Sequence, residues 1–236
     1  MDISPDTIII FKWNGIHFSA TIIFTWIVMA ILVLISYLAT RNLSIGPKIS
    51  RWQNFLEVII GYIRQQIKEI TQQNPDPFVP FLGTLFLFIS VSNLLTIIPG
   101  YQAPTSSLST TSALAISVFL AVPVFGIAKK GVWGYFKHYL EPSIFMLPFN
   151  IIGDFSRTLA LAIRLFGNMM SGTLIIAVLL LIAPLFVPII MQVLGLLIGQ
   201  IQAYIFAVLA TVYIASATRI DKPNQIEQKK RSKKDE

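Results

Sequence analysis

The sequence has no cysteine among its 236 residues, and only 12% of the residues are charged. The absence of cysteine excludes disulfides, thiolate metal ligands and cysteine-based catalysis. Soluble domains carry about a quarter charged residues. The low charge content, the 55% hydrophobic residues and the mean hydropathy of +0.72 therefore indicate an integral membrane protein. We expect no catalytic residues, no cofactor and no metal site.

The apolar residues are grouped into runs that predict an all-α membrane protein with five membrane-embedded helices and one amphipathic surface helix. A bilayer-crossing helix needs about 20 apolar residues. The expected elements are spans at 18–40, 78–98 and 112–128, a surface helix at 50–73, a helical hairpin at 145–218 and a basic tail at 219–236. Both helices of the hairpin are longer than a perpendicular span requires, so we expect them to be strongly tilted or curved.

The segment 50–73 differs from the other runs because it is amphipathic. Apolar residues such as Phe55, Ile59 and Ile63 recur at helical spacing, whereas charged residues such as Glu57 and Arg64 occupy the other faces. We expect this helix to lie on the membrane surface or against a partner.

The basic residues predict the orientation of the chain. Lysine and arginine are concentrated in the connections 41–51 and 129–141 and in the tail, while the connection 99–111 has no charge. The positive-inside rule then places the N-terminus outside and the C-terminal tail in the cytoplasm. We interpret the tail as a solvated anchor and not as a nucleic-acid-binding segment.

Arg164 differs from the basic residues of the connections and the tail, because it lies within an apolar segment of the chain. No Asp, Glu, Lys, Arg or His follows it before Arg219. A charged side chain at the bilayer centre costs about 2.5 to 3.5 kcal/mol on insertion scales, so such an arginine indicates a functional site. The alternative is an arginine that reaches the headgroups from a helix end. A permanent cation in a low-dielectric wall attracts a carboxylate, favours its ionised form and repels mobile cations.

Two polar stripes accompany Arg164. On its own helix, residues that share its face are Arg157, Asn168 and Ser171. The stripe on the final helix consists of Gln192, Gly195, Gly199 and Gln202. Close helix packing explains the glycines. The glutamines could line a wet cavity or form hydrogen bonds to Arg164 across the hairpin, since apolar side chains would suit packing better.

The stretch from Arg164 to Met169 closely resembles the signature of subunit a of F-type ATP synthases. Three further stretches are similar to that family: Asn93–Gly100, Leu147–Ile152 and Gln202–Leu209. These matches cover nearly the whole chain in order. The family has a first transmembrane helix, an amphipathic surface helix, two more spans and a long tilted hairpin that wraps a rotating c-ring. The resemblance thus implies the layout read from the apolar runs.

The resemblance also implies a function as an ion-conducting stator subunit that is not an enzyme on its own. An ion would enter one aqueous half-channel, bind a c-ring carboxylate, travel nearly a full turn and leave by a second half-channel. Arg164 would lie between the half-channels, block a direct leak and make each carboxylate release its ion. Gln202 would be the family's glutamine that faces this arginine, and Asn168 its motif asparagine. The implied partners are the c-ring, the peripheral-stalk b subunits, membrane lipid and H+ or Na+. The implied location is a bacterial plasma membrane, with a thylakoid or plastid membrane as the alternative.

The sequence departs from the family pattern along the expected ion path. Many relatives have ionisable residues nine positions after the arginine and seven before the glutamine, where this chain has Thr173 and Gly195. Near the cytoplasmic mouth, Asp154 and Arg157 stand where relatives also place charges. The candidate channel-lining residues are Asn93, Ser107, Ser109, Asp154, Arg157, Ser171, Thr173, Gln192, Gly195 and Gly199. Few of them can be protonated, which favours sodium, as in the N-type branch of the family, over protons.

Two other functions remain open from the residues. A secondary transporter could use Arg164 to bind a substrate, although inverted repeats and a broken-helix site, typical of such proteins, are not visible. A passive membrane scaffold would need Arg164 only for its structure. Exchange of Arg164 for alanine distinguishes the scaffold, which would keep ion-coupled activity.

The predicted topology can be tested in this cysteine-free chain. Single cysteines at Ser107 and Ser232 should react with a membrane-impermeant maleimide from opposite sides of the membrane, because the two segments are expected outside and inside. Labelling from the same side would contradict the predicted layout.

Overall fold

The computed structural model describes residues 9–13, 16–41, 51–98, 100–140, 146–182 and 187–219. The elements are β1 (Ile9–Trp13), β2 (Ile16–Ser19), α1 (Ala20–Thr40), α2 (Arg51–Thr71), α3 (Val79–Leu94), η1 (Leu95–Ile97), η2 (Pro104–Ser106), α4 (Leu108–Leu140), α5 (Met146–Ile182) and α6 (Val187–Thr218). Of the six α-helices in the described residues, five, all except α2, are long and apolar enough to cross a membrane. The prediction of a multi-pass, all-α membrane fold is therefore confirmed.

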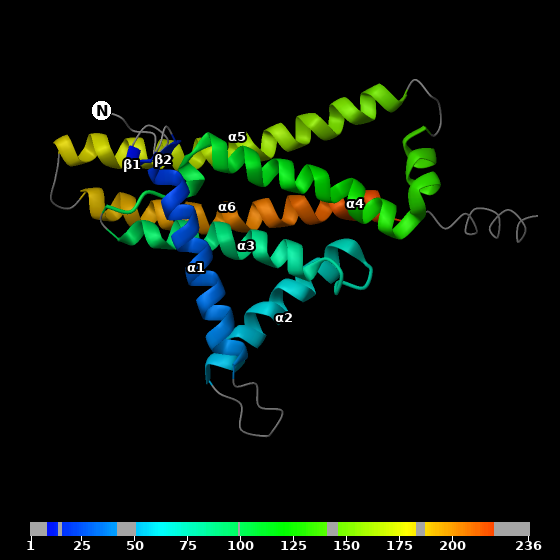
Figure 1. Cartoon of the computed structure of the whole chain (residues 1–236), viewed down its shortest axis with the longest axis horizontal. Coiled ribbons are helices and arrows are strands. Elements are labelled where there is room, and N and C mark those ends of the chain that lie inside the picture. The colour runs from blue at the N-terminus through cyan, green and yellow to red at the C-terminus, as the bar shows by residue number, and fades with distance from the viewer. Residues whose placement is uncertain are drawn as a thin grey trace, which may run out of the picture.

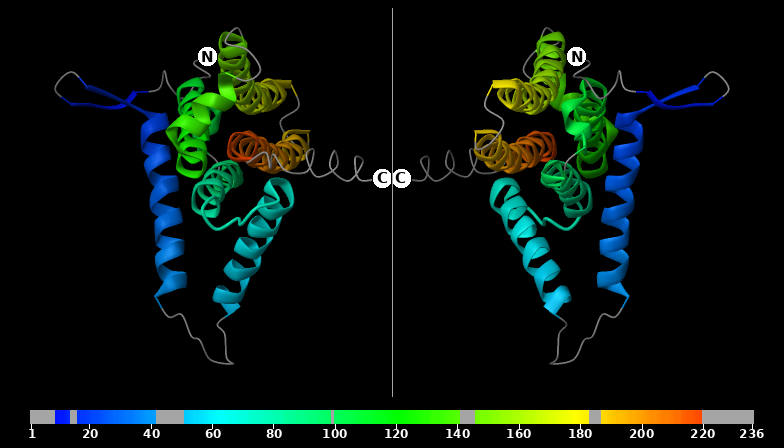
Figure 2. Two further views of the ribbon diagram at one scale, coloured as in Figure 1. Left: turned by 90° about the vertical axis from the view of Figure 1, so that its right-hand side faces the viewer. Right: turned by 90° about the vertical axis from the view of Figure 1, so that its left-hand side faces the viewer.

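Helices α3 to α6 run side by side and form a bundle, while α1 and α2 extend from it as two arms (Figures 1 and 2). Helix α1 meets the long axis of the bundle at a steep angle (Figure 1). Helix α5 has 37 residues and α6 has 32, which at about 1.5 Å per residue gives lengths well beyond the roughly 30 Å of a bilayer core. If α1 crosses the membrane steeply, the α5–α6 hairpin must be strongly tilted.

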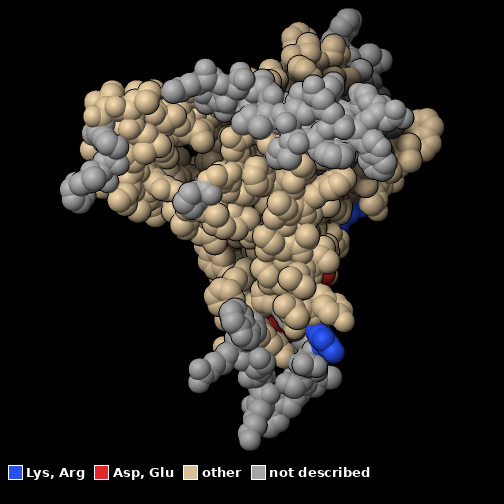
Figure 3. Space-filling model, turned by 60° about the vertical axis from the view of Figure 1, so that its left-hand side comes forward, with Lys and Arg blue, Asp and Glu red and all other residues tan. Residues whose placement is uncertain are grey.

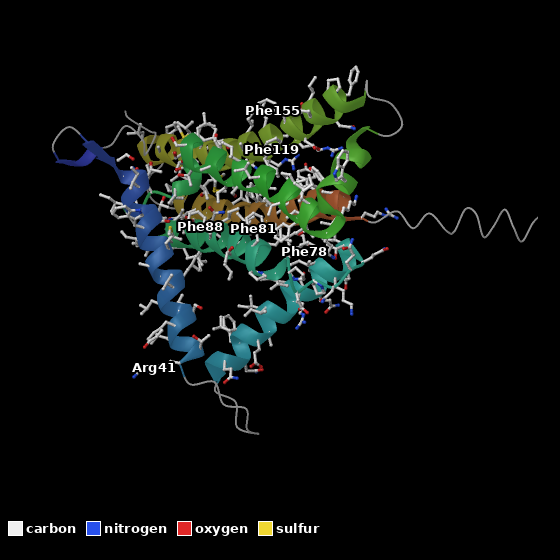
Figure 4. All side chains as sticks on the ribbon, turned by 45° about the vertical axis from the view of Figure 1, so that its right-hand side comes forward. Arg41, Phe78, Phe81, Phe88, Phe119 and Phe155 are labelled. Atoms are coloured by element: carbon white, nitrogen blue, oxygen red, sulfur yellow. The ribbon has the colours of Figure 1, made fainter. Side chains whose placement is uncertain are left out.

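The core of the bundle surrounds α6, which packs against α3, α4 and α5. Its fully buried side chains include Phe78, Leu82, Ile89, Leu161, Leu165, Phe206 and Ile214. The ring of Phe78 also packs edge-on against Phe125 of α4, with the ring centroids 5.3 Å apart. Figure 4 shows Phe78 just before α3, and Phe81 and Phe88 along it. By contrast, few residues of α5 are buried, namely Leu161, Ala162 and Leu165 among those whose burial is described. Most of that helix is an apolar surface open to lipid or to a partner.

The outer surface of the described residues is largely uncharged over the bundle. Figure 3 shows a face on which neutral atoms predominate, and the few visible charged side chains lie low on it or at its margin. Helix α2 is the main exception, because it carries Arg64, Lys68 and Glu69 on its exposed side and buries Ile67. An ion pair joins Arg64 to Asp76 in the connection that follows. These features are typical of a helix at the membrane surface.

Two features of the chain were not predicted. The strands β1 and β2 pair antiparallel as a short hairpin before α1; the sequence signal was Asn14-Gly15 between them, a favoured pair for two-residue hairpin turns. Helix α4 is also longer than the predicted span 112–128. Its backbone departs from helical angles at Gly131, where φ is +74°, a region that glycine adopts without strain.

The connection between α3 and α4 folds back onto the bundle. Thr105, Ser106, Ser107 and Thr111 are buried, and η2 packs against both α4 and α5. We call these four residues and Asn93 the loop polar cluster. Because Ser107 is buried while Ser109 is exposed, Ser109 is the better position for the outside cysteine of the topology test. Ser232 lies outside the described residues, as does most of the predicted tail.

Side-chain amides join α3 to α6. Asn93 Nδ2 donates to the carbonyl oxygen of Gly199 at 2.8 Å, and Asn93 Oδ1 accepts a hydrogen bond from Thr105 Oγ1 at 2.7 Å. Gln200 Nε2 donates to the carbonyl oxygen of Ser90 at 3.0 Å. Since amides buried in an apolar interface are costly without partners, these bonds fix how α3 and α6 pack.

Gly199 is needed for this close approach. A Cβ atom at position 199 would lie 3.1 Å from Asn93 Cβ and 3.2 Å from Asn93 Nδ2. Asn93 cannot easily move away, because hydrogen bonds hold both ends of its amide. We therefore predict that Gly199→Ala lowers stability by about 1 to 3 kcal/mol despite the better helix propensity of alanine.

The measurement is thermal unfolding of the purified protein in detergent. The matched control is Gly195→Ala, because a Cβ there would meet no atom within 4 Å. Gly195→Ala should melt at or above the parent temperature and Gly199→Ala below it. Equal melting temperatures for the two variants would show that Asn93 does not constrain position 199.

Candidate functional site

Arg164 lies on the exposed face of α5. The opposite face of the same turns is anchored in the core by Leu161 and Leu165, whose exposed fractions are 2% and 0%. Ile163, beside Arg164, is 54% exposed, so the arginine emerges from an apolar surface. Within the described part of the chain, its guanidinium has no hydrogen-bond or ion-pair partner. The fold thus presents an uncompensated cation on a surface that would otherwise suit lipid.

One turn beyond Arg164, α5 and α6 are joined by a hydrogen bond between two predicted site residues. Asn168 Nδ2 donates to Gln202 Oε1 at 2.9 Å. Gln202 is 3% exposed, so its amide needs such a partner. The sequence left open a bond from a glutamine to Arg164; in the structure Gln202 binds Asn168 instead. The bond holds both amides beside the arginine and leaves its guanidinium available.

The remaining residues of the two stripes, together with Thr173, have different surroundings. Gln192 Nε2 donates to the carbonyl oxygen of Thr96 at 2.9 Å, which ties it to η1 and not to Arg164. Ser171 and Thr173 are exposed and donate to carbonyl oxygens of their own helix, at 3.2 Å and 2.8 Å. Gly195 is half-buried with open space beside it. Among the predicted stripe residues, Asn168 and Gln202 are the pair that a hydrogen bond joins across the hairpin.

Beyond Arg164, toward the end of α5 where η2 packs, the polar groups are neutral. The hydroxyls of the loop polar cluster are buried, and so are the nearby hydroxyls of Ser92 and Tyr101, which lie close to each other. Gln102 Oε1 is also buried and has no hydrogen-bond partner among the described residues. Burial raises the pKa of the Tyr101 phenol above its usual value, so it stays a neutral hydroxyl. Buried oxygens without protein partners are typical of positions that water occupies.

On the other side of Arg164, a cavity of about 550 Å³ lies between α4, α5 and α6. Asp154 and Arg157 line it and form an ion pair of 3.4 Å between Arg157 Nη1 and Asp154 Oδ1. The guanidinium of Arg157 also lies over the ring of Tyr213 of α6, 5.8 Å from its centroid. This end of the site is therefore charged and has room for water, unlike the neutral end at the loop polar cluster.

Some residues of the site were not found from the sequence. Thr105 orients Asn93, Gln200 ties α6 to α3, and Tyr213 contacts Arg157. Their roles depend on contacts between residues far apart in the chain, and helical spacing within one segment carries no signal for them.

Comparison with known proteins identifies a family that matches most of the chain. The family model described as "ATP synthase A chain" matches residues 22–215. A protein of Acaryochloris marina (strain MBIC 11017) named "ATP synthase subunit a 2" is 60% identical over 224 residues, which cover 95% of this chain and 96% of the relative. The "ATP synthase subunit a 2" of Picosynechococcus sp. (strain ATCC 27264 / PCC 7002 / PR-6) is 56% identical, with 95% and 97% covered. The "ATP synthase subunit a" of Albidiferax ferrireducens (strain ATCC BAA-621 / DSM 15236 / T118) is 56% identical, with 94% and 96% covered.

Proposed function

The chain belongs to the ATP synthase A chain family, and we propose that in this ion-conducting stator subunit Arg164 is the charge that releases the coupling ion from each passing carboxylate of a ring. As subunit a, the chain is not catalytic on its own. Membership of this family excludes the two alternative functions, a secondary transporter and a passive scaffold.

The observation that carries the proposal is that Arg164 is exposed on an apolar helix face and has no partner among the residues that the structure describes. A guanidinium is always protonated, so it cannot relay a proton itself. It lowers the pKa of a carboxylate that approaches it and weakens the binding of a cation to that carboxylate. The same charge repels a mobile cation that tries to pass. One residue would thus both empty the ring site and prevent a leak.

Asn168 and Gln202 are the supporting residues of this proposal. Their mutual hydrogen bond of 2.9 Å fixes α6 against α5 next to the arginine. Because Gln202 is already engaged, Arg164 keeps its donors for an incoming carboxylate, to which it can bind in a bidentate manner.

The two half-channels would reach Arg164 from its two polar sides. The cavity with Asp154 and Arg157 is the candidate path to the cytoplasm. The path to the outside would run past the loop polar cluster, with Ser109 near its entrance. Thr173 and Gly195 would lie along it, where hydroxyls and open space take the place of ionisable groups.

The exposed surfaces support the proposed partners. The ring would face the exposed sides of α5 and α6, where apolar residues such as Ile163 and Ile201 are more than half exposed. The apolar arm α1 and the amphipathic arm α2 would remain available to lipid and to the b subunits of the peripheral stalk. We propose a bacterial plasma membrane as the location, with the N-terminus outside and the C-terminus in the cytoplasm, because the basic connections favour that orientation.

The central prediction concerns Arg164→Lys. Lysine keeps a charge only if its pKa survives burial against the ring, and it lacks the planar fork that binds a carboxylate. We expect the variant to insert and assemble but to lose most ATP-driven ion pumping in membrane vesicles. Arg41→Lys, at the far end of α1 (Figure 4), makes the same change away from the site and should pump normally. Near-normal pumping by Arg164→Lys would overturn the proposed role.

The coupling ion is the second prediction. Sodium needs a path with oxygen ligands and water, whereas protons benefit from groups that exchange them, and the outside path offers hydroxyls such as those of Thr105 and Ser107. We propose sodium. Sodium should stimulate ATP hydrolysis by the purified complex at alkaline pH and protect the ring carboxylate from a carbodiimide, relative to potassium at equal ionic strength. If neither effect occurs, the ion is the proton.

A further inference from the structure

The α5–α6 hairpin has few charged residues, and only one of its two arginines has an acidic partner among the described residues. Between Met146 and Thr218 the only charged residues are Asp154, Arg157 and Arg164. Arg157 and Arg164 lie seven residues apart and share one face of α5. Both are exposed, but Arg157 is paired with Asp154 while Arg164 has no such partner within the described residues.

We propose that Asp154 acts as a positioning and charge-compensating residue, which neutralises Arg157 so that Arg164 is the only net positive charge a ring carboxylate meets on the hairpin. This inference rests on the proposed function of Arg164. It gives Asp154 a task other than guiding ions through the cavity.

The geometry explains why compensation is needed. Seven residues of helix separate the two guanidinium-bearing turns by about 10 Å, so a carboxylate near one arginine still feels the other in a low-dielectric setting. Two unpaired arginines would give a ring carboxylate two binding positions on the same face of α5. The carboxylate would then be held between them instead of passing Arg164 and leaving.

The ring of Tyr213 keeps Arg157 at this position. The guanidinium lies 5.8 Å from the ring centroid, within the range of a cation–π interaction. Loss of the carboxylate of Asp154 would therefore not release Arg157 to the membrane surface. It would leave a second cation held against α6, and the net charge of the hairpin would rise from +1 to +2, since one negative charge is lost from the set of Asp154, Arg157 and Arg164.

The test is a double-mutant cycle in the assembled complex, reconstituted in vesicles and driven by ATP. The variants are Asp154→Asn, Arg157→Gln and the double variant. Asp76→Asn is the matched control, because it also removes the acid of an exposed Arg–Asp ion pair, that of Arg64, on a different part of the chain. The pumping rate is measured over a range of sodium concentrations and of pH, which separates the maximal rate from the ion concentration at half-maximal rate.

We expect Asp154→Asn to lower the maximal pumping rate roughly three- to tenfold without changing the ion concentration at half-maximal rate. Removal of the extra cation in the double variant should recover most of that loss, and Asp76→Asn should pump normally. Recovery by a second substitution is not expected if Asp154 only stabilises the fold.

Three results would overturn the inference. A double variant as slow as Asp154→Asn would give Asp154 a role independent of Arg157. A higher ion concentration at half-maximal rate with an unchanged maximal rate would mean that Asp154 attracts ions into the cavity. Normal pumping by the complex with Asp154→Asn would show that an uncompensated Arg157 does not hold back the carboxylates of the rotating ring. None of these results would contradict the role of Arg164, which the Arg164→Lys variant tests separately.

Discussion

The structure depends on how one permanent charge is held at an apolar surface. Placing an unpaired guanidinium in the membrane costs free energy. In α5, the apolar packing of the opposite helix face offsets this cost. Leu161 and Leu165 are fully buried on that face, so the helix cannot rotate to hide Arg164. The arginine is kept exposed because the apolar core fixes the helix that carries it.

Polar contacts between helices then determine where the rest of the site lies. In an apolar medium hydrophobic burial does not distinguish one helix packing from another, whereas an amide without a partner is costly. Asn93 ties α6 to α3, and the pair of Asn168 and Gln202 ties α6 to α5. Helix α6 is thus held on two sides around Arg164, and the small size of Gly199 allows the closest of these contacts.

The two ends of the site differ in chemistry, and this difference suits a subunit that passes ions between two compartments. Neutral oxygens surround the loop polar cluster, while the cavity at the other end contains the ion pair of Asp154 and Arg157. Cations near the cavity therefore meet a compensated pair, and cations or carboxylates near the middle of α5 meet Arg164 alone. In the proposal made above, compensation of Arg157 by Asp154 leaves Arg164 as the single electrostatic centre of the hairpin.

The sequence by itself determined the membrane class, the number of long helices and the position of Arg164, because bilayer thickness fixes the length of an apolar helix and a charge within it is rare. Helical spacing also placed Asn168 on the face of Arg164. It did not reveal that Gln202 binds Asn168, that Gln192 binds the carbonyl of Thr96, or that Tyr213 holds Arg157. Those partners lie on other helices, and which amide meets which acceptor depends on the rotation and height of each helix in the bundle. Only the tertiary structure decides these, since many alternative pairings would satisfy the same polar groups.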